Sequence, residues 1–175
     1  MPIFPLSLID QFWFSMSAPA EEKRLLALIN DARVHPEKYP PHGNSAGASM
    51  AGCTSPFRTS RALTLDARDH SDYLRDPADV DWIKTDGNAH QGRNGLPTTG
   101  DSGLMAQDGF VARAENVAFG FAMAEEVVQS WMQDDEARQW GHRNNILACE
   151  KLEAGVGHCQ GGPWGHYWTL DMGTK

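Results

Sequence analysis

The sequence has little of what marks several large classes of protein. Its 175 residues include only three cysteines, too few for a domain held together mainly by disulfides. No run of 18 apolar residues occurs, so no segment is expected to span a bilayer. Basic residues are also scarce, with 15 Lys and Arg against 23 Asp and Glu, and the formal net charge is -8. A nucleic-acid partner or an anionic membrane surface would require a basic stripe, so both are disfavoured.

The cysteines Cys53, Cys149 and Cys159 allow at most one intrachain disulfide. A Cys149–Cys159 pair is disfavoured, because an extended strand rising about 3.3 Å per residue would hold their Cα atoms much further apart than the roughly 7 Å that a disulfide tolerates. We therefore favour a Cys53–Cys149 disulfide, and three reduced cysteines are the alternative.

The length fits one domain with a substantial core, preceded by an apolar arm. Residues 1–20 are apolar and aromatic, but they contain no Lys or Arg, and Asp10 interrupts the apolar run. A standard secretory signal begins with basic residues, so we do not predict one here. We expect residues 1–20 to pack on the domain or to mediate self-association, because exposed aromatic side chains are adhesive. Residues 21–175 form the predicted domain.

Hydrophobic spacing predicts three helices. Apolar residues recur at helical spacing over 25–32 and predict a helix that ends before Pro36. Similar patterns predict a second helix over 65–74 and a third over 124–131. His70 lies on the apolar face of the second helix, so we interpret it as a core-edge histidine bonded to backbone.

The C-terminal part has the signals of a β-hairpin. Residues alternate in polarity over 152–156, and a second strand-like run covers 167–172, with a glycine-rich turn between them. Gly155 and Gly157 indicate that a helix approaches the strand backbone closely. Helices on both sides of a strand-rich middle predict an α+β fold, a three-layer α-β-α sandwich.

The stretch from Ala114 to Leu147 organises the chain. Glu115 lies at its start and His142 near its end, and the amphipathic helix between them would fix both polar ends by burying its apolar face. His90 lies upstream, in a polar and glycine-rich region over 79–110 that we expect to form one wall of a cleft. We therefore predict that His90, Glu115 and His142 converge in one cleft.

Two interpretations of Glu115 and His142 remain open. Titratable groups that converge in a cleft are often functional. Alternatively, a buried Glu115 would accept hydrogen bonds from backbone amides and from His142, and would simply tie the helices to the loop. In the acidic connector over 133–140, we interpret Asp135 and Glu136 as solvated residues.

Five motifs follow one another between Glu21 and Gly173. They are the loop around His90, Glu-Asn-Val-Ala-Phe-Gly from Glu115, Val-Val-Gln-Ser-Trp-Met from Val127, Gly-His-Arg-Asn-Asn-Ile-Leu from Gly141, and the Gly-Val-Gly and Tyr-Trp-Thr strands. Their order resembles the CAP superfamily of cysteine-rich secretory, antigen 5 and pathogenesis-related 1 proteins, and is most similar to its bacterial-type, SCP-like domain. The resemblance implies a three-layer α-β-α sandwich and an extracellular or cell-envelope location. It also makes Asp134, three residues after Trp131, a possible second acid.

Two imidazoles and a carboxylate suit a divalent metal ion. Neutral imidazole nitrogens are common zinc ligands, and a carboxylate completes or orients such a set. We therefore predict a metal site of His90, His142 and Glu115, and the resemblance implies zinc as the option. Because no third ligand is secure, we expect weak and exchangeable binding.

The leading functional prediction is a binding module rather than an enzyme. A polar cleft with glycine-rich walls and an aromatic rim can hold a small ligand without turning it over. Candidate rim residues are Trp82, Trp140, Trp164 and Trp168. Related proteins bind sterols, lipids or cell-wall components, so the resemblance implies a lipid- or cell-wall-derived ligand. The alternative is a metal-assisted peptidase or esterase in which Glu115 is the general base.

Overall fold

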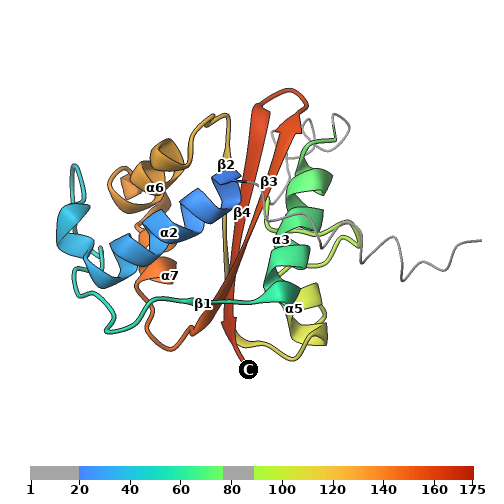
Figure 1. Ribbon diagram of the computed structural model, residues 1–175, viewed down its shortest axis with the longest axis horizontal. Coiled ribbons are helices and arrows are strands. Elements are labelled where there is room, and N and C mark those ends of the chain that lie inside the picture. Colours follow the sequence, from blue (N-terminus) through green and yellow to red (C-terminus); the bar gives the residue numbers. More distant parts are fainter. Residues whose placement is uncertain (1–19, 77–88) are drawn as a thin grey trace, which may run out of the picture.

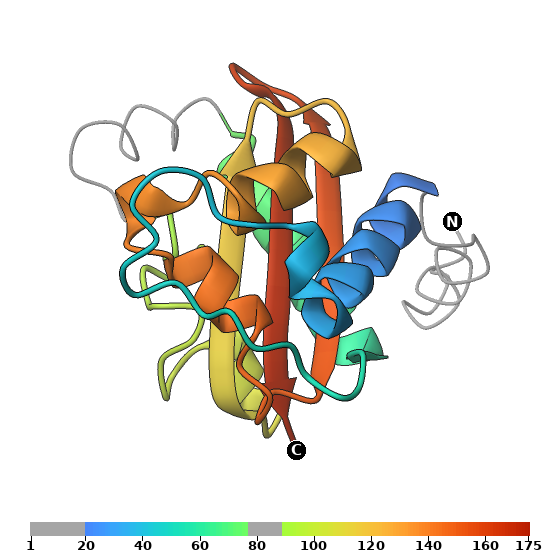
Figure 2. The same ribbon diagram turned by 90° about the vertical axis from the view of Figure 1, so that its left-hand side faces the viewer.

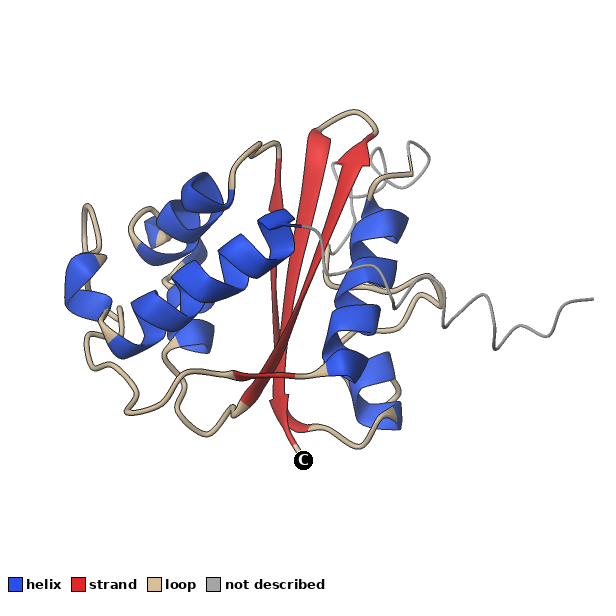
Figure 3. Cartoon of the chain, viewed as in Figure 1, coloured by secondary structure: helices blue, strands red, loops and turns tan. Residues whose placement is uncertain are grey.

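A four-stranded sheet separates two layers of helices in the computed structural model, which describes residues 20–76 and 89–175 (Figure 1). One face of the sheet carries α2 (Ala20–Val34), α6 (Ala124–Met132) and α7 (Gly141–Ile146). The other face carries α3 (Arg61–Leu74) and the short α5 (Leu104–Gln107), as Figure 3 also shows. The predicted α+β sandwich of three layers is confirmed. Residues 1–19 of the predicted arm lie outside the described residues.

The sheet has the strand order β1-β3-β4-β2. Its strands are β1 (Arg58–Thr59), β3 (Glu153–Gly161), β4 (Gly165–Thr174) and β2 (Val111–Phe119). β3 and β4 pair as the predicted antiparallel hairpin, β1 is parallel to β3, and β2 lies antiparallel to β4. Strand β2 was not predicted, because it mixes Arg, Glu and Asn with alanines and shows little alternation. It places Glu115 in the middle of an edge strand.

The first two helices begin and end for local reasons. α2 buries Leu25, Ile29 and Ala32 and stops at Val34, because Pro36 starts a 3-10 turn, η1 (Pro36–Lys38). α3 begins four residues before the predicted start. Ser60 caps it there, since its side-chain oxygen accepts a hydrogen bond from the Leu63 N–H at 3.5 Å.

Two glycines bring α3 against the sheet. A Cβ atom at Gly155 would overlap the backbone of Leu63 and Thr64, and one at Gly157 would overlap the backbone of Ala67. Only glycine permits this approach, so the predicted close packing of a helix on β3 is confirmed.

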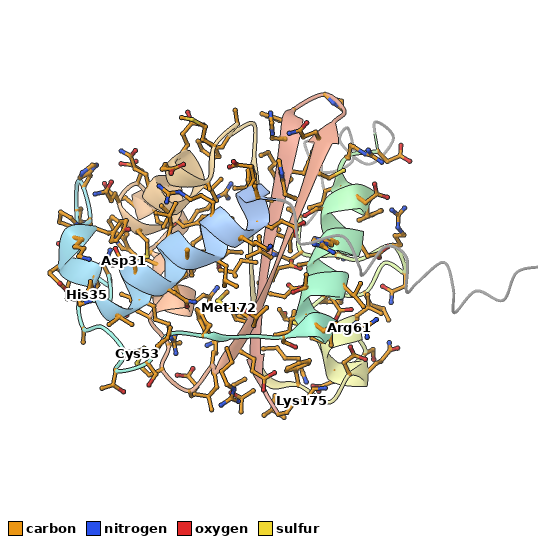
Figure 4. All side chains as sticks on the ribbon, in the orientation of Figure 1. Asp31, His35, Cys53, Arg61, Met172 and Lys175 are labelled. Carbon is orange, nitrogen blue, oxygen red and sulfur yellow. A yellow bond between two sulfur atoms is a disulfide. The ribbon has the colours of Figure 1, made fainter. Side chains whose placement is uncertain are left out.

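The long loop between η1 and β1 crosses the α7 side of the molecule (Figure 2). The predicted Cys53–Cys149 disulfide joins this loop, on which Figure 4 labels Cys53, to the segment after α7, with Cα atoms 5.5 Å apart. Cys159 remains a thiol. The Ser49 N–H donates to the Asn144 side chain at 2.8 Å. The loop therefore holds α7 from outside. No helix among residues 20–76 and 89–175 has the length and apolarity to cross a membrane.

Candidate functional site

Glu115 is buried on the α3 side of β2 and is in contact with two imidazoles. Its Oε1 atom lies 2.8 Å from Nδ1 of His90 and 3.5 Å from Nε2 of His70. Burial alone would raise the pKa of Glu115, but the charge of His70 and the hydrogen bond from His90 outweigh it and lower this pKa. Glu115 is therefore a carboxylate, and the Nδ1–H group of His90 donates to it.

His70 has the position predicted for it. It is buried on α3, and its Nε2 atom lies 2.8 Å from the carbonyl oxygen of Ala89, the residue before His90. The predicted bond to backbone is confirmed. The same nitrogen faces Glu115, so His70 both secures the chain next to His90 and contributes positive potential to the buried carboxylate.

His142 is held by a different acid, Asp135. Its Nδ1 atom lies 2.7 Å from Oδ1 of Asp135, while Oδ2 accepts from the backbone N–H groups of His142 at 2.8 Å and Arg143 at 3.3 Å. Asp135 thus satisfies donors at the start of α7 and orients the imidazole. The prediction that Asp135 is solvated is wrong, because the residue is only 2% exposed.

The chain reaches this arrangement through two residues with positive φ. Gln139 (φ 53°) and Trp140 (φ 61°) turn the backbone between Asp135 and His142, so that the acid faces the helix it precedes. Asp134, the predicted second acid, pairs with His42 at 2.8 Å on the surface and not with His142.

His90 and His142 line one cavity of about 470 Å³. Its wall also includes apolar and aromatic residues, among them Val117, Phe119, Phe121 and Trp131, and the acids Asp134 and Asp135. Glu115 lies behind His90 and is not part of this wall. The structure therefore brings the two histidines to one cavity, and each has a buried carboxylate at its Nδ1 atom.

Two asparagines connect the halves of the site. The Asn116 amide on β2 donates to the carbonyl oxygen of His142 at 3.0 Å, and the Asn145 amide on α7 donates to Asn116, also at 3.0 Å. This network fixes α7 to the sheet beside the cavity.

The predicted tryptophan rim is largely wrong. Trp140 and Trp168 are buried, and their indole N–H groups donate to backbone carbonyl oxygens. Trp164 is 45% exposed and packs near Phe119, with ring centroids 6.2 Å apart, while Trp82 lies outside the described residues. The aromatic wall is formed instead by Phe119, Phe121 and Trp131.

Each of the two imidazoles has the hydrogen bond at Nδ1 that a metal-ligating histidine usually has. When Nδ1–H of a neutral imidazole donates to a carboxylate, Nε2 carries the lone pair, which is the usual state of a metal-ligating histidine. Within the described part of the chain, no three His, Cys, Asp or Glu side chains are grouped closely enough to hold a metal ion together. A bound ion would therefore take its remaining ligands from water or from a small molecule.

The comparisons with known proteins identify a family and several solved structures of similar fold. Residues 26–172 match the model of the CAP family, the cysteine-rich secretory protein family. Similar solved structures include a cysteine-rich secretory protein from Staphylococcus aureus (17% identity, TM-score 0.50), an outer surface protein from Borrelia burgdorferi (12%, 0.57) and an extracellular SCP-domain protein from Bacillus anthracis (18%, 0.57). Each alignment covers 91% of this chain, and the chain spans 42%, 96% and 45% of those proteins. No curated protein gives a significant sequence match.

Proposed function

The chain belongs to the CAP family, and we propose that the cavity between His90 and His142 binds a divalent metal ion, a small lipid- or cell-wall-derived ligand, or both. The observation that carries this proposal is the pair of imidazoles at one cavity, each oriented by a buried carboxylate.

The metal part of the proposal rests on the two carboxylates that hold the imidazoles. Glu115 and Asp135 fix the ring orientation and the tautomer of His90 and His142. Zinc accepts neutral imidazole nitrogens readily, and such an ion would polarise a ligand that coordinates it. With only two protein ligands we expect weak binding that chelators reverse.

The ligand part of the proposal rests on the wall of the cavity. A volume of about 470 Å³ is within the range of small-molecule sites. Apolar side chains such as Val117 and Phe121 lie close to ionisable ones, so the wall suits a molecule with an apolar body and a polar head.

An extracellular or cell-envelope location is part of the same proposal. The disulfide between Cys53 and Cys149 is typical of an oxidising compartment. The staphylococcal neighbour is described as secretory and the Bacillus neighbour as extracellular.

A zinc titration tests the metal part. Isothermal titration calorimetry should give weak binding to the full chain, and His90→Ala and His142→Ala should each reduce affinity by roughly tenfold or more. His35→Ala, at an exposed histidine on the far end of α2, is the matched control and should leave affinity unchanged. Unchanged affinity in both site variants would contradict the proposal.

The hydrolase alternative has its own readout. Glu115 is not part of the cavity wall, so a general-base role at a molecule bound there lacks geometric support. We expect no zinc-dependent turnover of peptide or ester substrates. Turnover that zinc supports and Glu115→Gln abolishes would favour the enzyme over the binding module.

A further inference from the structure

A second cavity lies on the opposite side of the sheet, between α3, α5 and the loop after His90. Its volume is about 170 Å³. Four carboxyl-bearing residues line it. Asp69 is exposed, and the other three are Asp66 from α3, Glu115 from β2 and Asp171 from β4. Glu115 and Asp171 are directly opposite each other in the strand register, so their carboxyl groups share one face of the sheet.

Each of these three carboxyl groups has an oxygen atom without a partner. Oδ2 of Asp66, Oε2 of Glu115 and Oδ1 of Asp171 are buried and accept no hydrogen bond from the described residues. Asp171 is 1% exposed, so bulk water does not satisfy it. Buried acceptors are normally paired, and three unpaired ones beside one cavity indicate a missing donor.

The groups near the cavity balance Glu115 but not Asp66 and Asp171. His70 and His90 both face Glu115. Arg93 lies at the cavity wall, but its guanidinium is engaged by Asp72 at 3.2 Å and Asp69 at 3.7 Å. Burial and the nearby charges of Asp108 and Asp69 raise the pKa of Asp66 to about 6, although Lys175 lowers it in part. Burial, the charge of Glu115 and a hydrogen bond with Glu115 raise the pKa of Asp171 well above its ordinary value. Within the described residues neither Asp66 nor Asp171 forms an ion pair, and each keeps a buried oxygen without a donor, so the cavity has room for a cationic donor beside them.

The arrangement of groups around the cavity suits an alkylammonium ion better than a metal ion. No group of three metal-ligating side chains suited to a metal ion occurs among residues 20–76 and 89–175. An ammonium group, in contrast, offers three N–H donors that can reach separate acceptors. The walls include Leu96, Leu104 and Met105, and the two leucines are 41% and 42% exposed at the rim. An alkyl chain would cover this apolar surface, as the stem of a lysine side chain does elsewhere.

We propose that this cavity is a second binding site, distinct from the histidine cavity, which takes a short primary alkylamine. The ammonium group donates to Asp66 and Asp171, and the alkyl chain lies against Leu96 and Leu104. Glu115 separates the two sites, since it faces this cavity and holds His90 from behind.

Calorimetry with n-hexylamine and n-hexanol tests this assignment. The two molecules differ in their polar end, so we expect hexylamine to bind one site per chain, roughly tenfold or more tightly than hexanol. Asp66→Asn and Asp171→Asn should each weaken hexylamine binding by roughly tenfold. Asp134→Asn removes the same charge at an exposed residue outside this cavity, where Asp134 pairs with His42, and should change the affinity by less than about twofold. His142→Ala should leave hexylamine binding unchanged while it weakens zinc binding.

Asp171→Asn keeps the size of the side chain, and circular dichroism would check that this variant folds. If it does not fold, Asp66→Asn decides the question, because Asp66 is only partly buried. Equal binding of hexylamine and hexanol, no measurable hexylamine binding, or full affinity in Asp66→Asn would each overturn the proposal.

Discussion

Asp135 carries more of the site than its place in an acidic connector suggests. Its side-chain carboxylate accepts three hydrogen bonds, from the His142 ring and from two backbone N–H groups of α7. Asp135→Ala should lower the free energy of unfolding by about 2–4 kcal/mol, because it leaves buried donors without acceptors. It should also weaken zinc binding by roughly 10- to 100-fold through the loss of imidazole orientation.

Urea unfolding and zinc titration measure these two effects. Asp134→Ala is the control, because Asp134 is adjacent in sequence but forms an exposed pair with His42. It should change stability by less than about 1 kcal/mol. A larger loss of stability in Asp134→Ala than in Asp135→Ala would contradict the assignment.

Asp66 gives a prediction for pH dependence. Its pKa is raised to about 6 from an ordinary value of 3.8, so the folded protein binds this proton more tightly than the unfolded chain. The stabilisation by this proton is fully present below about pH 4 and is lost as the pH rises through about 6. Asp66→Asn should therefore be more stable than the unsubstituted chain at pH 7, by roughly 1 kcal/mol after solvent screening.

Urea unfolding at pH 4, 5, 6 and 7 checks the sign. The difference between Asp66→Asn and the unsubstituted chain should grow with pH, whereas Asp134→Asn should show no such trend. A difference that shrinks with pH would show that Asp66 is stabilised as a carboxylate.

The residues of the two cavities differ in how far the sequence reveals them. His90, Glu115 and His142 could be proposed because they lie in motifs with a recognisable order. Asp135 could not, since its reach to His142 depends on two positive-φ residues that no local rule predicts. Asp171 was also missed, because its position opposite Glu115 depends on a strand register that sequence alone does not give.

The contact between α3 and β3 depends on the absence of a side chain. Gly155→Ala would force a Cβ atom into the backbone of Leu63 and Thr64, which cannot move aside as a flexible side chain would. We expect a loss of at least about 1–3 kcal/mol of unfolding free energy, measured by urea unfolding. Gly141→Ala is the control, because open space surrounds its Cβ position. Equal effects of the two substitutions would mean that the layer spacing adapts easily.

Elements with a regular pattern or a clear turn were predictable, and β2 was missed. The apolar spacing of α2 was readable, because a helix that packs on one side has a regular period. β3 and β4 were readable from the alternation over 152–156, the strand-like run over 167–172 and the turn between them, although β4 is buried along most of its length. β2 was not, because its two faces meet different partners. Glu115 and Val117 face α3, while Asn116 and Ala118 face the α6 and α7 layer, so both faces are largely buried without a simple apolar pattern.

The disulfide joins two segments that are far apart in the sequence. Cys53 and Cys149 are 96 residues apart, and loop-closure entropy predicts a stabilisation of about 4.7 kcal/mol for a loop of this length. The double variant Cys53→Ser/Cys149→Ser should lose most of this free energy of unfolding. Cys159→Ser, at the remaining thiol, should lose little.

The location of the disulfide predicts which part of the site loosens. It anchors the loop that contacts Asn144 and Arg143 on α7, whereas His90 is held by Glu115 and the backbone beside His70. In the double serine variant, hydrogen exchange should therefore accelerate over 141–147 more than over 61–74. Zinc should also bind more weakly, because His142 lies on the loosened helix while His90 does not. Uniform acceleration in both segments would instead indicate that the two sides of the sheet unfold as one unit.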